Sequence, residues 1–319
     1  MRLTVDTLNK SFGDKHVLKD LSFESKGGAF GLLGRNGSGK TTTIRIIMDI
    51  FPADSGTVLF DGKPLRSFKG RIGYLPEERG LYPKRPIVEQ MAYIGALRGM
   101  KAADAKKRGL ELLKRLDAEE HYKKKLDTLS KGNQQKIQLA IALINDPELV
   151  ILDEPFSGLD PVNARTLKEL VTELAAEGRT IIFSSHQMAS VEEFCSELCI
   201  INAGHPVMSG NLRQIKKSYP RNRILLVPQD ENAEALRQTV LAQEALRGLT
   251  EKAETNAQGC VVTLRRPEDK GRLLQVVADA GHEIDVFKVM EPSLEEIFVE
   301  KCGQDTAAQA DGSGGKGHA

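Results

Sequence analysis

Residues 34–41 read Gly-Arg-Asn-Gly-Ser-Gly-Lys-Thr, and this stretch decides the fold of the 319-residue chain. Its pattern is G-x-x-x-x-G-K-[ST], the phosphate-binding loop that joins a buried strand to a helix. The apolar run Ala29–Leu33 precedes it, and Ile44, Ile47 and Met48 follow at helical spacing. The sequence therefore predicts a strand, a phosphate loop and a helix in the order that the motif requires.

The chemistry of this loop suits a nucleoside triphosphate. Glycines let backbone N–H groups turn inward around phosphate oxygens, and the helix N-terminus adds the positive end of its dipole. We expect Lys40 to reach the β- and γ-phosphates and the Thr41 hydroxyl to contact Mg²⁺. The loop alone fits a transport ATPase, a GTPase or a small-molecule kinase, so other motifs must decide among them.

Two carboxylates follow a second apolar strand. Leu149–Leu152 runs into Asp153 and Glu154, and open α/β sheets bind their ligands at the carboxyl ends of such strands. We expect Asp153 to hold Mg²⁺ through water and Glu154 to polarise the water that attacks the γ-phosphate. The alternative is a strand that simply ends in acidic turn residues.

A histidine follows a third strand. Thr180–Phe183 is followed by Ser184, Ser185 and His186, so the imidazole is predicted at the same edge of the sheet, placed to hydrogen-bond the γ-phosphate. A lone histidine after a strand often has only a structural role. Its position relative to the other motifs favours the functional interpretation.

In this order the motifs resemble the ATP-binding subunit of an ABC transporter over about residues 1–215. The segment Leu129–Asn133 reads Leu-Ser-Lys-Gly-Asn and stands where that family has its LSGGQ signature, with Lys131 and Asn133 as departures from it. Ser130 and the first N–H groups of the following helix form a second anion site. The resemblance implies that this site closes over the γ-phosphate held by another cassette, so that a head-to-tail dimer encloses two ATP molecules.

The resemblance also implies roles for single residues. Phe12 lies where the family has an aromatic side chain that stacks on adenine, although it can also be a core residue of an amphipathic strand. Glu77 stands where the family usually has a glutamine that contacts Mg²⁺, and a carboxylate can do the same. The expected nucleotide-binding residues are Phe12, Gly34, Asn36, Gly37, Ser38, Gly39, Lys40, Thr41, Thr42, Ser130, Gly132 and Asp160. The expected catalytic residues are Glu154, His186 and Lys40, and the expected Mg²⁺ ligands are Thr41, Glu77 and Asp153.

The expected fold class is α/β, a P-loop NTPase cassette of the ABC type at residues 1–218 with a helical subdomain at about 88–145. Residues 221–302 read as strand, helix, two strands, helix and strand, which predicts a small α+β domain with a ferredoxin-like fold. A short helix, Leu294–Val299, closes that pattern. Residues 303–319 are rich in Gly and Ala without periodicity and are predicted to be a disordered tail.

The predicted function is an ATPase that powers export through a separate transmembrane permease. Glu291–Phe298 reads Glu-Pro-Ser-Leu-Glu-Glu-Ile-Phe and resembles the closing segment of ATP subunits in ABC-2 type exporters of sodium, drugs or peptides. The implied cofactors are ATP and Mg²⁺, and the implied partners are the permease and a second ATP-binding subunit, as a homodimer. The alternatives are an importer ATPase and a soluble ABC-type ATPase that acts on ribosomes or nucleic acid.

Composition narrows these classes further. The 45 Lys and Arg residues nearly balance the 44 Asp and Glu residues, which argues against a dedicated nucleic-acid binder. Apolar runs such as Leu139–Ile144 are far shorter than the roughly 20 residues that span a bilayer. The N-terminus also lacks the continuous apolar stretch of a signal peptide. We therefore expect a cytoplasmic protein, peripheral on the inner face of the cell membrane through its permease partner.

Overall fold

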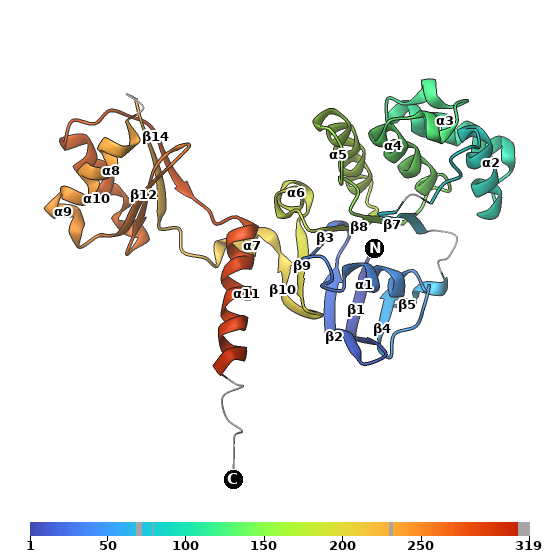
Figure 1. Ribbon diagram of the computed structural model, residues 1–319, viewed down its shortest axis with the longest axis horizontal. Helices are drawn as coiled ribbons and strands as arrows, with labels where there is room; N and C mark the ends of the chain where they lie inside the picture. Colours follow the sequence, from blue (N-terminus) through green and yellow to red (C-terminus); the bar gives the residue numbers. More distant parts are fainter. Residues whose placement is uncertain (68–71, 79, 230–231, 312–319) are drawn as a thin grey trace, which may run out of the picture. The chain divides into compact units, whose positions relative to one another are not determined.

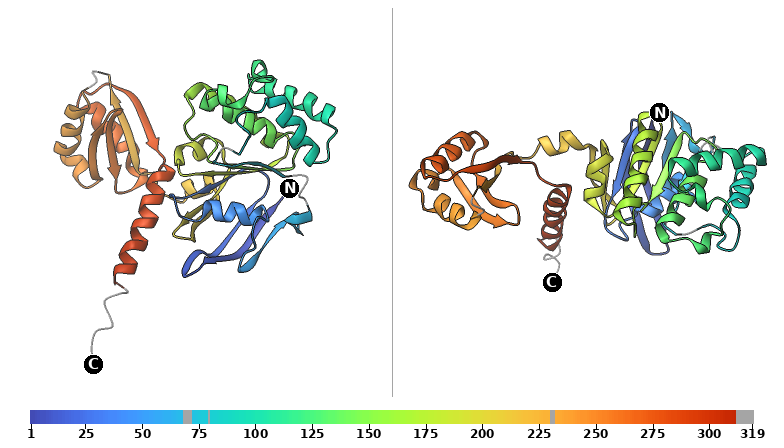
Figure 2. Two further views of the ribbon diagram at one scale, coloured as in Figure 1. Left: turned by 45° about the vertical axis from the view of Figure 1, so that its right-hand side comes forward. Right: turned by 90° about the horizontal axis from the view of Figure 1, so that it is seen from above.

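The computed structural model describes residues 1–67, 72–78, 80–229 and 232–311, with side chains described as far as residue 302. It divides into two compact units (Figures 1 and 2). One unit consists of Met1–Leu212 together with the chain from Ile297 onward, and the other consists of Arg213–Glu296. Each unit has its own hydrophobic core. The phosphate loop belongs to the first unit.

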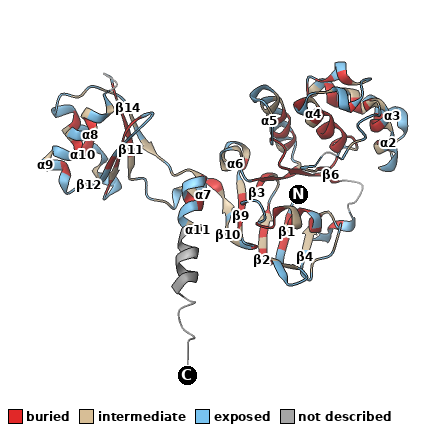
Figure 3. Ribbon diagram, viewed as in Figure 1, coloured by how far each residue is buried: buried red, intermediate tan, exposed pale blue. Residues whose placement is uncertain are grey.

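A six-stranded sheet forms the centre of the first unit (Figure 1). Its strands are β3 (Gly28–Leu33), β6 (Ile72–Leu75), β7 (Leu149–Asp153), β8 (Thr180–Ser185), β9 (Glu197–Asn202) and β10 (His205–Asn211). The order is β10-β9-β3-β8-β7-β6, and all neighbours run parallel except the β10–β9 pair. Every residue of β7 and β8 is buried (Figure 3), as expected for parallel strands covered on both faces.

The parallel strands bring three predicted motifs to one edge of this sheet. β3 leads into the phosphate loop, β7 into the acidic pair, and β8 into His186. In register, Asp153 lies beside Ser184 on β8, and Ser184 lies beside Leu32 on β3. The carboxyl ends of the three strands therefore end at nearly one level, where ligands bind in open α/β sheets.

A smaller antiparallel sheet shares a core with the central sheet. Its strands are β1 (Leu3–Phe12), β2 (Lys15–Ser25), β4 (Ser55–Phe60) and β5 (Lys63–Pro64), in the order β2-β1-β4-β5. Helix α1 (Lys40–Ile47) follows the phosphate loop and buries Ile44 and Ile47 in the same cluster. Phe23 of the small sheet stacks on Phe30 of the central one, with ring centroids 5.1 Å apart. Helix α1 thus packs in one core with residues of both sheets.

Between β6 and β7 the described residues form helices and turns. The helices are α2 (Ile87–Leu97), α3 (Ala102–Arg115) and α4 (Lys131–Ala142), with 3-10 turns at Glu119–His121 and Leu126–Thr128. Helices α5 (Pro161–Ala176) and α6 (Met188–Phe194) follow β7 and β8, and α7 (Leu212–Lys217) follows β10. Among the helices that the structure describes, none combines the length and the apolar character that crossing a membrane takes.

The second unit is a four-stranded antiparallel sheet with helices packed against it (Figure 1). Its elements are β11 (Arg223–Pro228), α8 (Ala233–Ala242), α9 (Glu244–Arg247), β12 (Thr250–Asn256), β13 (Gly259–Leu264), α10 (Lys270–Asp279) and β14 (Ile284–Met290). The order β12-β13-β11-β14 is that of the predicted ferredoxin-like fold. Leu236 and Val240 of α8 and Leu273 of α10 pack on Ile224 and Val262 of the sheet.

The last helix is longer than expected from the sequence. Helix α11 spans Leu294–Asp311, so it continues past Val299 into the segment predicted as a tail. Its start is a capping box, because the Glu296 N–H donates to Ser293 Oγ and the Ser293 N–H donates to the Glu296 carboxylate. Alanine-rich sequence after the cap favours helix. Residues 312–319 of the predicted tail lie outside the described residues.

Candidate nucleotide site

Close backbone packing at the phosphate loop requires glycine at two positions. A Cβ on Gly34 would lie 2.4 Å from both the Ile201 carbonyl oxygen and Ser38 Oγ. Gly39, directly before α1, has φ +113° and would place a Cβ 2.6 Å from Leu18. Side chains cannot occupy these positions without moving the loop. The glycines of the motif therefore fit the loop between the central sheet and the small sheet.

Lys40 lies inside the loop and is buried. Its Nζ donates to the Gly34 carbonyl oxygen at 2.7 Å and lies 3.4 Å from the carbonyl oxygen of Arg35. It is also 3.6 Å from Glu154 Oε1. The ammonium group is thus held by the carbonyls of the loop and by one carboxylate, and phosphate oxygens would take over these contacts.

A hollow of about 400 Å³ lies over the phosphate loop. Its size is in the range of small-molecule sites. It is lined by Phe12, Lys15, Val17, Asn36, Gly37, Gly39, Lys40, Thr41, Thr42, Glu77 and Glu154. All of these except Lys15 and Val17 are residues that the sequence predicts for nucleotide, metal or catalysis, and the structure brings them together.

Phe12 is held at this hollow by an aromatic neighbour. Its ring is 49% exposed, which leaves a face open for stacking. Phe51 meets the ring edge-to-face, with centroids 5.5 Å apart at 86°. Lys10 lies over the same ring, its Nζ 5.5 Å from the centroid. An exposed, oriented ring favours the stacking role over a core role for Phe12.

Asp153 is almost fully buried at the end of β7. The Ser184 hydroxyl donates to Asp153 Oδ1, while Oδ2 has no hydrogen-bond partner among the described residues. Burial raises the pKa of Asp153, and the negative charges of Glu77 and Glu154 raise it further, against the Ser184 hydrogen bond and Lys40. A buried carboxylate oxygen without a partner suits a bound cation or its water.

The residues present fit Mg²⁺ that is shared with a nucleotide. No cluster of three or more His, Cys, Asp or Glu side chains able to cage an ion occurs in the described part of the chain. Mg²⁺ is usually bound through one or two carboxylates together with phosphates and water. Asp153, with its orphaned oxygen, and Thr41 and Glu77, at the hollow, supply that kind of incomplete set.

Glu154 has an unusual backbone conformation. Its φ is +49°, in the left-handed region, which costs energy for a residue with a side chain. The Glu154 N–H is held by the Ser184 carbonyl oxygen at 3.2 Å and by Ser184 Oγ at 3.3 Å. The turned backbone places a buried carboxylate in the hollow beside Lys40.

His186 pairs with Glu154. Its Nδ1 lies 2.9 Å from Glu154 Oε2, whereas the sequence predicts an imidazole that contacts phosphate. The His186 side chain is 43% exposed and does not line the hollow. Its visible role is to orient the carboxylate of Glu154.

The signature segment and Asp160 form a second group of site residues. Ser130 caps α4, its Oγ accepting from the Asn133 N–H at 3.3 Å. A Cβ on Gly132 would lie 2.5 Å from Asn163 Nδ2, and that nitrogen donates to Asp160 Oδ2 at 2.5 Å. Hydrogen bonds from the Asn163 backbone and side chain lower the pKa of Asp160. Ser130, Gly132 and Asp160 do not line the hollow over the phosphate loop.

Two residues of these groups are missed by sequence reasoning. Ser184 holds both Asp153 and the backbone of Glu154, and its only sequence signal is its place at the end of a strand beside the acidic one. Asn163 joins Gly132 to Asp160. Its place in the first turn of α5 signals a helix start, but no local pattern predicts contact with residue 132.

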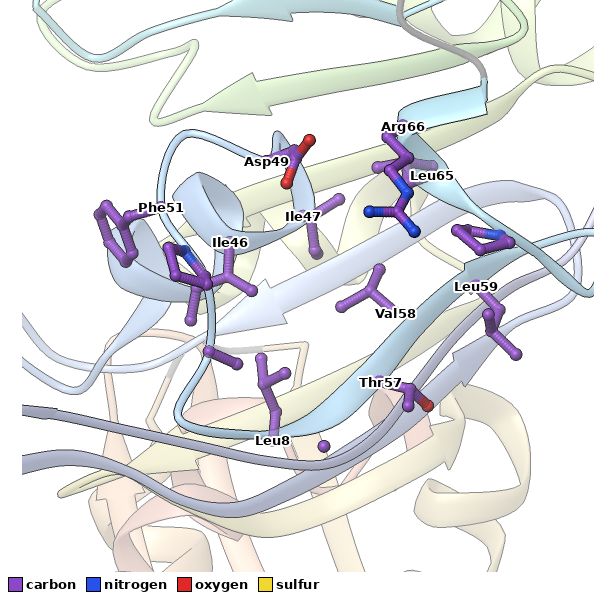
Figure 4. Close-up of a pocket in the computed structure, with 14 residues that line it drawn as sticks. Leu8, Ile46, Ile47, Asp49, Phe51, Thr57, Val58, Leu59, Leu65 and Arg66 are labelled. Atoms are coloured by element: carbon purple, nitrogen blue, oxygen red, sulfur yellow. The ribbon is translucent and has the colours of Figure 1, made fainter.

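A second hollow lies apart from these groups. It has a volume of about 320 Å³ and a mainly apolar lining between α1 and the small sheet (Figure 4). Its labelled lining includes Leu8, Ile46, Val58 and Leu65, with Asp49 and Arg66 as the charged members. None of the predicted site residues lines it.

An exposed aromatic patch lies on the helical part of the first unit. We call Tyr82, Tyr93 and Leu97 the aromatic patch; they are 55%, 53% and 69% exposed. The centroids of the two tyrosine rings lie 6.4 Å apart, and both residues line a hollow of about 380 Å³. Gln90 fixes the loop beneath, hydrogen-bonding the Tyr82 N–H at 2.9 Å and the Tyr82 carbonyl oxygen at 3.0 Å. Large apolar side chains gathered on a surface indicate a partner.

Comparison with known proteins gives two family matches. A family model described as ABC transporter matches residues 18–157. A second, described as the C-terminal domain of the DrrA1-3-like ATP-binding protein, matches residues 210–302. A solved structure described as the ATP-binding subunit of an ABC transporter superposes with a TM-score of 0.63 at 30% identity, covering 68% of this chain and 93% of that one.

Similar full-length relatives occur in bacteria. The uncharacterized ABC transporter ATP-binding protein YhaQ of Bacillus subtilis is 40% identical, covering 94% of this chain and 98% of the relative. The linearmycin resistance ATP-binding protein LnrL of the same organism is 31% identical, with coverages of 95% and 98%. Nod factor export ATP-binding protein I of Cupriavidus metallidurans is also 31% identical, with the same two coverages.

Asp153→Asn is expected to stabilise the nucleotide-free protein at neutral pH. Because the pKa of Asp153 is raised in the fold, the folded state binds more protons than the unfolded state between the two pKa values, and stability falls as the pH rises through that window. The variant lacks this loss. Thermal unfolding measured from mildly acidic to neutral pH checks this prediction. The difference in stability between the variant and the wild type should widen as the pH rises.

Asp160→Asn is the matched control with the opposite sign. The pKa of Asp160 is lowered, so its carboxylate stabilises the fold above its unfolded pKa, and this stabilisation is lost as the pH falls. This variant should be less stable than wild type at neutral pH, with the gap closing toward acid. A stability gap for Asp153→Asn that stays constant over the pH range would contradict the assignment.

The packing of Gly132 on Asn163 predicts a change of sign in a double-mutant cycle. In the wild-type background, Gly132→Ala should destabilise the protein by about 1–3 kcal/mol, because the new Cβ meets Asn163 Nδ2. In an Asn163→Ala background the same change should stabilise it by up to about 1 kcal/mol through helix propensity. Urea unfolding measures the change in the free energy of unfolding that Gly132→Ala causes in each background. Gly248→Ala is the control, because the new Cβ there enters open space. Additive effects would refute the contact.

Proposed function

Because this chain belongs to the ATP-binding proteins of ABC transporters, which hydrolyse ATP, we propose that it drives export of a substrate through a separate transmembrane permease. Two copies of the chain would close head-to-tail around two ATP molecules. The permease would hold the chain at the inner face of the cell membrane.

One observation carries the head-to-tail arrangement: each chain has two separated groups of site residues. The phosphate loop, Glu77 and Glu154 line one hollow, and Ser130 and Gly132 do not reach it. The N-terminus of α4 leaves N–H groups, beyond the one capped by Ser130, directed at no hydrogen-bond partner of its own helix. A second copy that presents its α4 to the first copy's ATP would complete both sites at once.

Within one site, the residues have separable tasks. The adenine ring would stack on Phe12, and Lys40 would exchange the Gly34 carbonyl for the β- and γ-phosphates. Thr41, Asp153 and Glu77 would hold Mg²⁺, which neutralises charge that develops on the phosphates. Together these contacts would hold the γ-phosphate near Glu154.

Glu154 is the proposed general base. Its Oε2 is oriented by His186, and its Oε1 faces Lys40 at 3.6 Å without a hydrogen-bond partner among the described residues. When Lys40 turns to the phosphates, Oε1 becomes available to accept a proton from the attacking water. His186 keeps the carboxylate in place through the contact of its Nδ1 with Oε2.

Relatives and the second unit support the export direction. LnrL is described as a linearmycin resistance protein and the Cupriavidus metallidurans relative as a Nod factor export protein, and each of these two matches 95% of the chain. The second unit matches the C-terminal domain of DrrA-like ATP-binding proteins. An importer ATPase remains the alternative from the sequence, and no observation here favours it.

The aromatic patch is the proposed docking surface for the permease. Tyr82 of the patch is five residues after Glu77, which lines the hollow over the phosphate loop. A partner that moves the loop at Tyr82 would therefore also move the chain near that hollow. Two half-exposed tyrosines and Leu97 offer apolar area, with Arg85 and Glu89 as polar neighbours. This fits an apolar helix end of a membrane protein.

Glu154→Gln should trap the ATP-bound dimer. Glutamine keeps the shape of the side chain but cannot accept the proton, so hydrolysis should fall at least about 100-fold while ATP still binds. Light scattering after size-exclusion chromatography with ATP should give twice the monomer mass. Lys40→Ala on its own is the control and should neither bind ATP nor form a homodimer. A Glu154→Gln protein that turns over at the wild-type rate would remove Glu154 from the base role.

Affinity-tagged chain should co-purify a membrane protein from a detergent extract of its own cells. Tyr93→Asp should lose this protein, because the carboxylate would have to be buried in the apolar contact. The nucleotide affinity of the variant should equal that of wild type, which excludes misfolding. Val162→Asp is the control, since Val162 is equally a surface residue, 74% exposed, outside the patch. Equal co-purification by all three chains would argue against docking at the patch.

A further inference from the structure

We propose that Arg98 is a positioning residue for ATP hydrolysis: it fastens the C-terminal end of the signature helix α4 to helix α2, which carries most of the aromatic patch. The position of Ser130 and Gly132 over the other copy's ATP then follows the position of α2. This inference rests on the proposed head-to-tail dimer.

Arg98 ends one helix with its backbone and caps another with its side chain. Its N–H closes α2 by donating to the carbonyl oxygens of Ile94 and Gly95, both at 3.1 Å. Its Nη1 donates to the carbonyl oxygens of Ile141 at 3.2 Å and Ala142 at 3.0 Å. These are the last two residues of α4, whose carbonyls have no N–H partner four residues on within the helix, although the Ile141 carbonyl also accepts from the Ile144 N–H at 3.3 Å.

The contact is electrostatic as well as geometric. Nη1 also lies 2.9 Å from Asn145 Oδ1, so its two N–H bonds are shared among three uncharged acceptors. The guanidinium therefore meets the negative end of the α4 dipole rather than a carboxylate. Burial lowers the pKa of Arg98, but an arginine stays charged in proteins. A half-buried cation with these partners resists separation of the two helices.

Helix α2 is packed too tightly against helix α3 to move without it. A Cβ on Gly95 would lie 2.3 Å from the Cβ of Ala105 on α3, and one on Gly109 would lie 2.3 Å from Met91 Sδ. The two helices therefore approach through glycines and move as one body. Tyr93 and Leu97, on the turns just before Arg98, belong to that body.

The same end of α4 also touches the strand that leads to Glu77. A Cβ on Gly73 of β6 would lie 2.6 Å from the Ala142 carbonyl oxygen, which is one of the two carbonyls that Arg98 holds. Helix α4 has 12 residues and so is about 18 Å long. It connects this junction at its C-terminal end to Ser130 at its N-terminal end, and a displacement at one end is carried to the other.

Mixed dimers test the role of Arg98 because they separate the two groups of site residues. In a dimer of wild-type chain with Lys40→Ala chain, only the wild-type phosphate loop holds ATP, and the signature over it comes from the Lys40→Ala chain. Arg98→Met on the Lys40→Ala chain should lower ATP hydrolysis at least about tenfold, as loss of a hydrogen bond to a charged group would give. Arg98→Met on the wild-type chain should leave hydrolysis near that of the parent mixed dimer.

Control variants exclude a general folding effect. Arg108→Met removes an arginine from exposed ion pairs with Glu111 and Asp146 and should have little effect in either chain. Arg98→Lys keeps the charge but not the planar set of guanidinium donors. Its rate of ATP hydrolysis should lie between those of wild type and Arg98→Met. ATP affinity of the Arg98→Met monomer should equal that of wild type, because the phosphate loop is intact.

Two results would overturn the inference, and they are distinguishable. Equal loss of hydrolysis from Arg98→Met in either chain, or no loss in either, would refute the positioning role while leaving the dimer intact. Failure of the Glu154→Gln chain to dimerise in the presence of ATP would refute the proposed head-to-tail dimer itself, and the inference with it.

Discussion

The register of three parallel strands is the constraint on which the rest of the molecule depends. Ser184 lies between Asp153 on one side and Leu32 on the other, so the phosphate loop, the acidic pair and His186 begin from one level of the sheet. A shift of one residue in any of these pairings would turn the alternate side chains to the opposite face. Complete burial of β7 and β8 makes such a shift costly, because every residue of both strands has packed neighbours.

Local sequence pattern was enough to predict most of the residues that line the hollow over the phosphate loop. The glycines, Lys40, Thr41 and the acidic pair are close in sequence to strand ends, so their placement follows from the strands alone. The elements of the second unit were also predictable from local pattern, because its strands and helices alternate at regular spacing. Helix α11 is longer than the sequence predicts, because the glycine and alanine content of its second half is typical of disorder, whereas a capping box starts the helix and alanine lets it continue.

Contacts between distant elements were outside the reach of the sequence. The small sheet around β1 and β2 pairs with irregular register, and positive φ at Thr7 and Asp20 breaks the alternation that would signal its strands. Arg98 and the end of α4 are more than 40 residues apart, and nothing beside Arg98 marks it as a cap. His186 was placed at the correct edge, yet its bond to Glu154 depends on the turned backbone of that residue.

The shared volume of Gly132 and Asn163 restricts how this sequence can drift. The Asn163 amide occupies the space that any side chain at position 132 would need, and it also ties down Asp160. A mutation at either position is therefore conditional on the other, although the two residues lie on different helices. Among descendants of this chain, a residue larger than glycine at 132 should become fixed only after position 163 has become smaller, which gives the evolution of this pair a preferred order.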